Sequence, residues 1–209
     1  MLHTATVDKG TLALLKELMN IKELNSFSLV GGTALSLKYG HRISEDLDLF
    51  SHEPFDKSVI IKLLEGWFAE RFHYEERGHK LGVFCYIDEV KVDIVRFPHQ
   101  LIRSIEVKDG IRIYSTEDII AMKIAAILRR AKKKDFWDIA ELLDHFSVDD
   151  FVKFFFEKYP TQMLAISIPQ VMTYFADAEL ETSNPIGFKG QTWKSVKSKI
   201  SKSVKEYLN

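Results

Sequence analysis

The 209-residue sequence predicts an α+β protein in which a strand-containing half, residues 1–115, precedes a helical half, residues 116–209. Three observations support this division. Short apolar runs that stop at turn residues, as strands do, occur before residue 115. Ser115-Thr116-Glu117-Asp118 resembles the capping sequence of a helix start. Beyond it, most of the chain has the apolar spacing of helices rather than of strands.

The individual elements follow from the spacing of apolar residues and from turn residues between them. The expected strands are residues 27–30, 47–51, 80–87, 90–97 and 110–115. The expected helices are residues 9–22, 33–39, 56–72, 119–146 and 192–208, with a loop at 181–190.

The composition, 46% hydrophobic and 28% charged, is that of a globular protein. A formal net charge of −1 neither supports nor excludes a nucleic-acid partner. The single cysteine, Cys85, lies in an apolar run and is expected to be a buried thiol in a reducing compartment. No signal-like N-terminus and no apolar stretch of about 20 residues is present, so we expect a cytoplasmic protein without a membrane partner.

Two aspartates, Asp46 and Asp48, lie at the predicted strand 47–51. The two-residue period of a strand places both on one face and the intervening leucines on the other, so the carboxylates are expected to face a cleft. Carboxylates about 7 Å apart at the backbone can converge on neighbouring divalent cations. The alternative is a pair of solvated side chains on an edge strand.

Asp93 interrupts the otherwise apolar strand 90–97. A buried carboxylate without a partner is costly, so Asp93 requires either a basic side chain or a cation. If this strand lies beside 47–51, Asp93 joins Asp46 and Asp48 in a site for hard cations such as Mg²⁺. The combination with a glycine turn upstream favours the metal site over an ion pair.

Gly31-Gly32-Thr33 separates the strand 27–30 from the helix 33–39. Backbone N–H groups at such a helix start favour a bound phosphate, although a simple turn is the alternative. The Thr33 hydroxyl can donate to the phosphate or cap the helix. The sequence is neither a Walker A loop nor a dinucleotide fingerprint, because the following Gly-Lys-Ser/Thr and the third glycine are missing.

Basic residues recur in the helical half. On one continuous helix, Lys123, Arg130 and Lys134 point within about 20° of one direction. Lys123 has apolar neighbours, and we expect its ammonium to reach a phosphate of a nucleotide rather than to snorkel into solvent. In residues 192–208, lysines surround an apolar stripe and either remain solvated or contact an RNA backbone.

The order of these motifs resembles a known family. Val30-Gly31-Gly32-Thr33-Ala34-Leu35, the segment 41–49 with Asp46-Leu47-Asp48, Val92-Asp93-Ile94 and the segment Lys123 to Asp138 are similar to the AbiEii/AbiGii nucleotidyltransferase-like toxins. That family lies within the DNA polymerase β-type nucleotidyltransferase superfamily. The resemblance implies a minimal nucleotidyltransferase core with a mixed β-sheet and flanking helices, followed by a helical domain that adds basic residues to the cleft.

The resemblance also implies the roles of site residues. Asp46, Asp48 and Asp93 are expected to hold two Mg²⁺ ions, and Lys123 is expected to be a further catalytic residue. The expected contacts to the NTP substrate are Gly31, Gly32, Thr33, Arg42, Ser44, Lys123, Arg130 and Lys134. Asp135 and Asp138 can either orient Arg130 or Lys134 or act on the acceptor, and Arg42 and Ser44 can either contact phosphate or fix their loop.

The implied activity is transfer of a nucleotidyl group from an NTP to an acceptor hydroxyl. The expected acceptor is RNA such as tRNA, or a protein, and the expected setting is a toxin–antitoxin or phage-defence system with a separate antitoxin. Two alternatives remain open: a non-catalytic NTP- or RNA-binding or regulatory protein with the same fold, and a nucleotidyltransferase that modifies an antibiotic.

Overall fold

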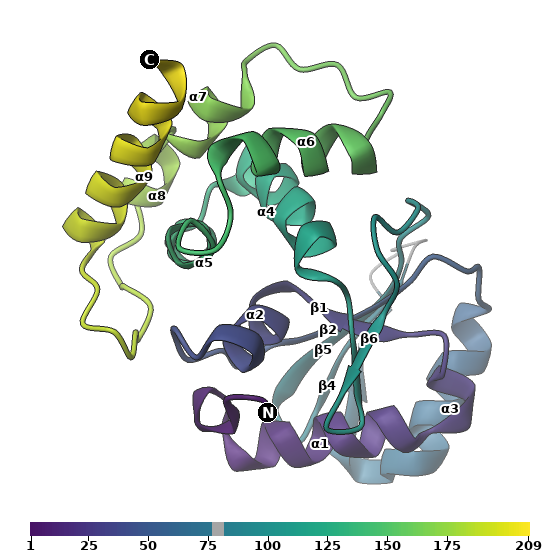
Figure 1. The fold of residues 1–209 in the computed structure, drawn as a ribbon. Coiled ribbons are helices and arrows are strands. Elements are labelled where there is room, and N and C mark those ends of the chain that lie inside the picture. The colour runs from purple at the N-terminus through teal and green to yellow at the C-terminus, as the bar shows by residue number, and fades with distance from the viewer. Residues whose placement is uncertain (77–81) are drawn as a thin grey trace.

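The computed structural model describes residues 1–76 and 82–209. Within them, the strands form one mixed sheet in the order β3-β4-β5-β2-β1-β7-β6 (Figure 1). Its strands are β1 (Ser28–Val30), β2 (Leu47–Ser51), β3 (Phe72–Tyr74), β4 (Gly82–Ile87), β5 (Val90–Arg96), β6 (Glu106–Lys108) and β7 (Ile111–Ile113). The predicted α+β fold with a mixed sheet is confirmed.

The centre of the sheet brings the predicted site strands together. Strands β2 and β5 run parallel, with Asp48 opposite Asp93, and β1 lies antiparallel on the other side of β2, with Val30 opposite Asp48. Leu47 and Leu49 are buried, whereas Asp48 between them is half-buried on the opposite face. The condition on which Asp93 could join Asp46 and Asp48, that strand 90–97 lies beside 47–51, is therefore met.

Helices cover both sides of the sheet. Helices α1 and α3 lie on one side, and α4 and the helices that follow it lie on the other (Figure 1). The helices are α1 (Lys9–Asn20), α2 (Gly31–Tyr39), α3 (Lys57–Phe68), α4 (Thr116–Arg130), α5 (Lys133–Leu142), α6 (Val148–Lys158), α7 (Ile168–Met172), α8 (Ala176–Glu179) and α9 (Trp193–Leu208). None of those in residues 1–76 and 82–209 is long and apolar enough to span a bilayer.

Helix α4 begins at the capping sequence identified at residue 115. The Ser115 hydroxyl accepts a hydrogen bond from the Asp118 N–H, which satisfies a donor that the first turn leaves unpaired. The described strands all precede this cap. The division into residues 1–115 and 116–209 remains an interpretation of this change in secondary structure.

The single helix predicted for residues 119–146 is wrong. Helix α4 ends at Arg130, Ala131 has a left-handed backbone with φ of 37°, and α5 starts at Lys133. Ala131 is fully buried, so tertiary packing holds a backbone conformation that alanine rarely adopts. No glycine or proline marks this break in the sequence, which is why apolar spacing alone did not predict it.

Other boundaries also differ from the predictions. The expected helix 56–72 ends at Phe68, and the residues after it form a 3-10 turn and strand β3. Strand β6 was not predicted; it pairs with β7 through the turn Asp109-Gly110, where both residues have positive φ. The first two residues of the predicted strand 80–87 lie outside the described residues.

The loop predicted at 181–190 forms backbone hydrogen bonds with residues 41–43. The Ile43 N–H donates to the Ile186 carbonyl at 2.8 Å, and the Phe188 N–H donates to the His41 carbonyl at 3.0 Å. These hydrogen bonds form an isolated antiparallel bridge between Arg42 and Gly187. The loop therefore holds the segment between α2 and β2 in place.

Helix α9 packs against the protein by its apolar stripe, as predicted for residues 192–208. Val196, Ile200 and Val204 are buried. Several lysines around the stripe are ion-paired, since Lys199 lies 2.6 Å from Asp144 and Lys197 pairs with Glu179. These ion pairs occupy part of the lysine set, and an RNA contact by this helix stays a prediction.

Candidate functional site

A cleft of about 750 Å³ lies between the sheet and helices α4 and α6. Its lining contains predicted nucleotide-contact residues and two of the three predicted metal ligands. These are Gly31, Gly32, Thr33, Arg42, Ser44, Asp46, Asp48, Lys123, Arg130 and Lys134. The described lining does not include Asp93.

Asp48 and Asp93 form a pair of adjacent carboxylates on parallel strands. Burial, and next the charge of Asp93, raise the pKa of Asp48 to about 6. The Oδ1 atom of Asp93 is buried and has no hydrogen-bond partner among the described residues. Two carboxylates this close leave negative charge uncompensated, which is the condition under which a cation binds.

Each flanking carboxylate has a lysine partner. Lys134 Nζ donates to Asp46 Oδ2 at 3.0 Å, and Lys91 Nζ donates to Asp93 Oδ2 at 2.5 Å. Burial opposes ionisation of Asp46, but the hydrogen bond and charge of Lys134 outweigh it and lower its pKa. The lysines and the carboxylates of these pairs are partly exposed, so the pairs can exchange with a ligand.

The aspartate triplet, Asp46, Asp48 and Asp93, has the oxygen donors that Mg²⁺ prefers. The unpartnered Asp93 oxygen and the raised pKa of Asp48 fit a divalent cation at this place. As the side chains stand, no group of three acidic, histidine or cysteine residues in the described chain is arranged to hold a metal. Asp46 must release Lys134 before it can turn toward the other two.

The diglycine begins helix α2 itself rather than a loop before it. Gly31 has φ of 73°, and a Cβ atom there would lie 2.6 Å from Asp48 Oδ2. At Gly32, a Cβ atom would lie 2.1 Å from a terminal nitrogen of Arg42. Both glycines thus allow a charged side chain to approach the helix N-terminus, where the helix dipole favours an anion.

Thr33 does not cap helix α2, contrary to one of the predicted alternatives. Its hydroxyl lies 2.9 Å from Ser44 Oγ and donates to the Asp46 carbonyl. Thr33 and Ser44 are both buried. In this structure they fix the backbone that carries Asp46.

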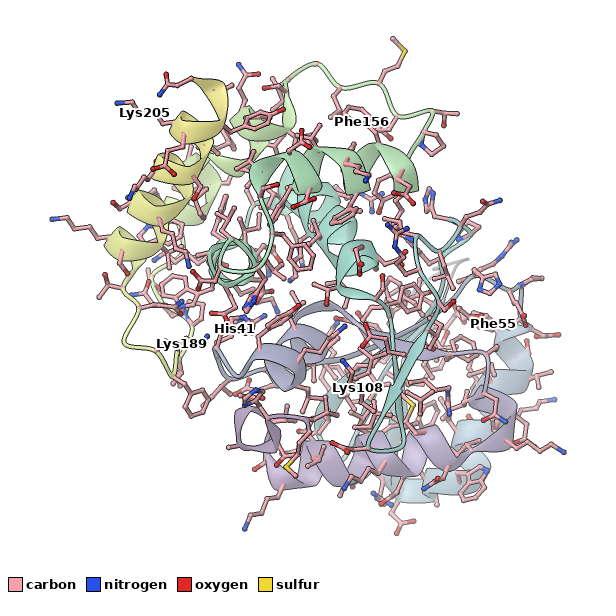
Figure 2. The ribbon with its side chains drawn as sticks, in the orientation of Figure 1. His41, Phe55, Lys108, Phe156, Lys189 and Lys205 are labelled. Carbon is pink, nitrogen blue, oxygen red and sulfur yellow. The ribbon has the colours of Figure 1, made fainter. Side chains whose placement is uncertain are left out.

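A buried charge cluster, the Asp138 hub, lies beside the cleft. Arg42 donates to both Asp138 oxygens, at 2.7 and 3.0 Å, and His41 Nε2 lies 2.7 Å from Oδ1. Lys123 Nζ lies 2.5 Å from Asp138 Oδ2 and 2.9 Å from Asp135 Oδ1. His41, labelled in Figure 2, lies between the sheet and the helices above it. The hub therefore joins the 41–44 segment to α4 and α5.

Electrostatics explain how these charges remain buried. Burial alone would raise the pKa of Asp138, but Arg42 and then Lys123 hold it well below its usual range. Burial would likewise lower the pKa of Lys123, but Asp135 and Asp138 raise it. Each charge is compensated by partners, which is the condition for burying it.

Lys123 was predicted to contact a phosphate, but in this structure it contacts two carboxylates. Its ammonium is held by Asp135 and Asp138, although the side chain also lines the cleft. The predicted shared face of Lys123, Arg130 and Lys134 is wrong, because α4 ends before Lys134. Arg130, whose side chain is half-exposed, and Lys134, which binds Asp46, nevertheless reach the same cleft.

Sequence reasoning left open the roles of Asp138 and Arg42 and gave no role to His41. The ion pair of Lys91 with Asp93 is the alternative to a cation that the sequence offered for Asp93. Arg42 uses three of its five N–H groups on Asp138 and Ile43. Two remain for a ligand within the described cleft. The pairing of residues 41–42 with residue 138 joins positions nearly a hundred residues apart, so no local spacing could predict it.

A second hollow, of about 360 Å³, adjoins the cleft. The two share Arg42, Ser44, Asp46 and Lys134, so the ion pair of Asp46 with Lys134 lies between them. Further lining of the second hollow comes from Glu45, Lys132, Lys133, Glu181 and residues 183–186. A group placed there would approach Asp46 from a different side than a group in the cleft.

Comparisons with known proteins agree with this geometry. The family described as nucleotidyl transferase AbiEii toxin, type IV toxin–antitoxin system, matches residues 13–182. An uncharacterized protein of Aquifex aeolicus is 31% identical over 200 residues, which cover 93% of this chain and 94% of that protein.

Two solved structures share the fold. A putative nucleotidyltransferase from Helicobacter pylori has a TM-score of 0.58 at 19% identity, covering 97% of this chain and 99% of that one. MenT4, a nucleotidyltransferase toxin from Mycobacterium tuberculosis, has a TM-score of 0.58 at 15% identity, covering 93% of this chain and 81% of that one.

Proposed function

The chain belongs to the AbiEii family of nucleotidyltransferase toxins, and from that premise we propose that it transfers a nucleotidyl group from an NTP to a hydroxyl of RNA, such as tRNA, with Mg²⁺. The observation that carries this proposal is the meeting of Asp48 and Asp93 beside the N-terminus of α2. This places uncompensated carboxylates next to a helix end that favours phosphate.

The residues of the chain have distinct parts in the proposed reaction. The start of α2 and Arg42 bind the triphosphate, because a helix N-terminus favours an anion and Arg42 lines the same cleft with two N–H groups that have no partner among the described residues. The Asp138 hub fixes Arg42 in place. Arg130 and Lys134 line the same cleft and offset charge on the departing pyrophosphate.

Asp46, Asp48 and Asp93 would hold the divalent cation, which when bound supplies charge neutralisation and polarises the reacting phosphate. The Asp48–Asp93 pair also accepts the proton of the attacking hydroxyl. The Asp93 Oδ1 atom, which has no hydrogen-bond partner among the described residues, supports this role.

The second hollow supports an acceptor with phosphates. It adjoins the cleft at Asp46, and its lining includes Lys132, Lys133 and Lys134. The lining also contains Glu45, Asp46 and Glu181, and Lys134 is paired with Asp46. Lys132 and Lys134 support the phosphodiester backbone of RNA as the acceptor, because lysines neutralise phosphates. We therefore propose RNA as the acceptor, in a toxin that a separate antitoxin restrains.

The test is label transfer from each of four α-labelled NTPs, with Mg²⁺, to total tRNA, to proteins of a cell extract and to an aminoglycoside. We expect labelled RNA, and no label with Asp48→Asn or Asp46→Asn. The exposed Asp88, paired with Arg71 on the far part of the sheet, provides a matched control, since Asp88→Asn should leave transfer unchanged. Undiminished transfer by both cleft variants would refute the site assignment.

Calorimetry separates this function from that of a binding module. NTP binding that depends on Mg²⁺, without label transfer or pyrophosphate release in any acceptor mixture, would favour the non-catalytic alternative. Label on the aminoglycoside and none on RNA would instead favour an antibiotic-modifying enzyme.

A further inference from the structure

The cleft has two chemically different ends. The charged end contains the aspartates, the glycines and Arg42, as described above. The other end, here called the aromatic end, is lined by Phe50, Phe97, His99, Phe155 and Tyr159. The proposed reaction assigns the charged end to the triphosphate and leaves the aromatic end without a role.

The strands place the two ends in sequence along one face of the sheet. Asp48 and Phe50 are two residues apart on β2, so they share a face and lie about 7 Å apart along the strand. Phe97 follows directly after the end of the parallel strand β5, four residues past Asp93, and its N–H donates to the Ser51 carbonyl at 2.7 Å. Both strands thus change from carboxylate to aromatic side chain in the same direction.

The aromatic end is a built platform. The Phe97 ring centre lies 5.6 Å from that of Phe50 and 4.7 Å from that of His99. Tyr159, from the end of α6, meets the His99 ring edge to face at 4.8 Å. Lys158 Nζ lies 5.3 Å from the Phe97 ring centre and is itself held by Asp118 and the Gln100 carbonyl. These contacts hold the Phe97 ring in a defined orientation.

We propose that the aromatic end binds the base of the nucleotide by stacking, with Phe97 as the main contact and with His99 and Tyr159 next to the base. This inference rests on the proposed function, because it takes an NTP as the occupant of the cleft. Phe50, two residues past Asp48, lies about as far from it as a ribose places the base from the α-phosphate, and the Phe97 ring centre is 5.6 Å from that of Phe50. An NTP is charged at one end and aromatic at the other, as the cleft is.

The polar side chains of the aromatic end, His99 and Tyr159, are uncharged and can form hydrogen bonds with the edge of an uncharged base. Burial, and next the charges of Lys158 and Arg129, lower the pKa of His99, so its imidazole is neutral at physiological pH. Burial raises the pKa of Tyr159, so its hydroxyl remains a donor. Stacking itself accepts every base, because each has a π-face. Selection among bases therefore depends on His99 and Tyr159.

The experiment compares two probes that differ by the nucleoside. Calorimetry with Mg²⁺ measures Kd for inorganic triphosphate and for the α,β-methylene analogue of each NTP, which the enzyme cannot cleave. For the wild-type chain we expect the analogues to bind more tightly than triphosphate. Phe97→Ala should weaken analogue binding about tenfold, the size expected for one stacked base, and leave triphosphate binding within about twofold.

Further variants separate stacking from folding. Phe97→Trp keeps an aromatic face and should retain most of the affinity, whereas Phe97→Leu keeps apolar bulk and should lose it. Tyr159→Phe should change the ranking of the four analogues more than their average affinity. Trp67→Ala removes an exposed aromatic residue on α3, across the sheet, and should change neither probe's binding.

The possible failures are distinct. If the wild-type chain binds triphosphate and the analogues equally, or if Phe97→Ala weakens both probes alike or neither, the base does not occupy the aromatic end. The proposed function survives each of these results. If the wild-type chain binds neither probe, the proposed function itself fails and this inference falls with it.

Discussion

Asp138 and Asp48 are both aspartates beside the cleft, but they differ in how their charge is compensated. Asp138 is completely buried and is contacted by Arg42, Lys123 and His41. These partners hold its pKa well below the usual range. Asp48 shares its site with another carboxylate, and its pKa is raised to about 6. The difference indicates that the Asp138 hub serves the fold, whereas the aspartate triplet is kept ready for a ligand.

The first prediction removes the compensation in the hub. Asp138→Asn leaves Arg42 and Lys123 buried with less opposing charge, and breaking a buried ion pair costs about 3–5 kcal/mol. Urea denaturation should show this loss in the free energy of unfolding. In the control Asp88→Asn, an exposed pair with Arg71 is broken, and the midpoint should hardly move. Equal effects of the two substitutions would contradict the hub's structural role.

The second prediction concerns the place where Arg42 of the Asp138 hub contacts the start of α2. Gly32→Ala places a Cβ atom 2.1 Å from an Arg42 nitrogen, so Arg42 or α2 must shift, at a cost of about 1–3 kcal/mol. Gly66→Ala on α3 is the matched control, because nothing lies within 4 Å of its Cβ position. That control should stabilise the helix slightly. Thermal unfolding of the two variants should therefore shift in opposite directions.

The third prediction tests the electrostatic cost of ionising Asp48 within the aspartate triplet. The pKa of Asp48 in the folded protein, about 6, lies above the ordinary value of 3.8 for an aspartate, so the cost of ionising it is fully present above about pH 6 and fades toward about pH 4. Asp48→Asn should thus stabilise the metal-free protein by about 1–2 kcal/mol at about pH 8. The gain should vanish near pH 4, as denaturation in EDTA at both pH values would reveal. A loss of stability at about pH 8 would contradict the uncompensated charge.

The fourth prediction has the smallest effect on stability. Lys134→Ala releases Asp46 from a partly exposed ion pair, which contributes less than about 1 kcal/mol. With its competitor gone, Asp46 should bind a divalent cation more readily, and Mn²⁺ affinity measured by electron paramagnetic resonance should rise a few-fold. Lys153→Ala, on α6, is a control that should not alter it. An unchanged or weaker affinity would mean that Lys134 does not compete with the cation.

The same contrast explains what the sequence could predict. The faces of Asp48 and Leu49 follow from the strand period, and the pairing of β2 with β5 follows from two apolar runs with matching aspartates. These are local patterns or simple extensions of them. The fold class and the charged residues at one end of the cleft were therefore accessible from spacing and resemblance.

The hub was less accessible for a physical reason. Its partners come from the 41–42 segment, α4 and α5, and the turn at Ala131 that orients α5 has no glycine or proline to announce it. The pair of Lys134 with Asp46 was also missed, because the two residues are far apart in the sequence, whereas Lys91 and Asp93 share a face of one strand. Which charged residues form ion pairs across long stretches of sequence is determined only once the chain has folded.

The bridge between Arg42 and Gly187 bears on the order in which the parts of the protein assemble during synthesis. Translation proceeds from the N-terminus, and the sheet can assemble once β7 has been made. The segment that carries Arg42 contacts Asp138 only after α5 has been made, and it gains its backbone partners in residues 186–188 later still. The charged end of the cleft is therefore fixed after the sheet, by parts of the chain that are synthesised later.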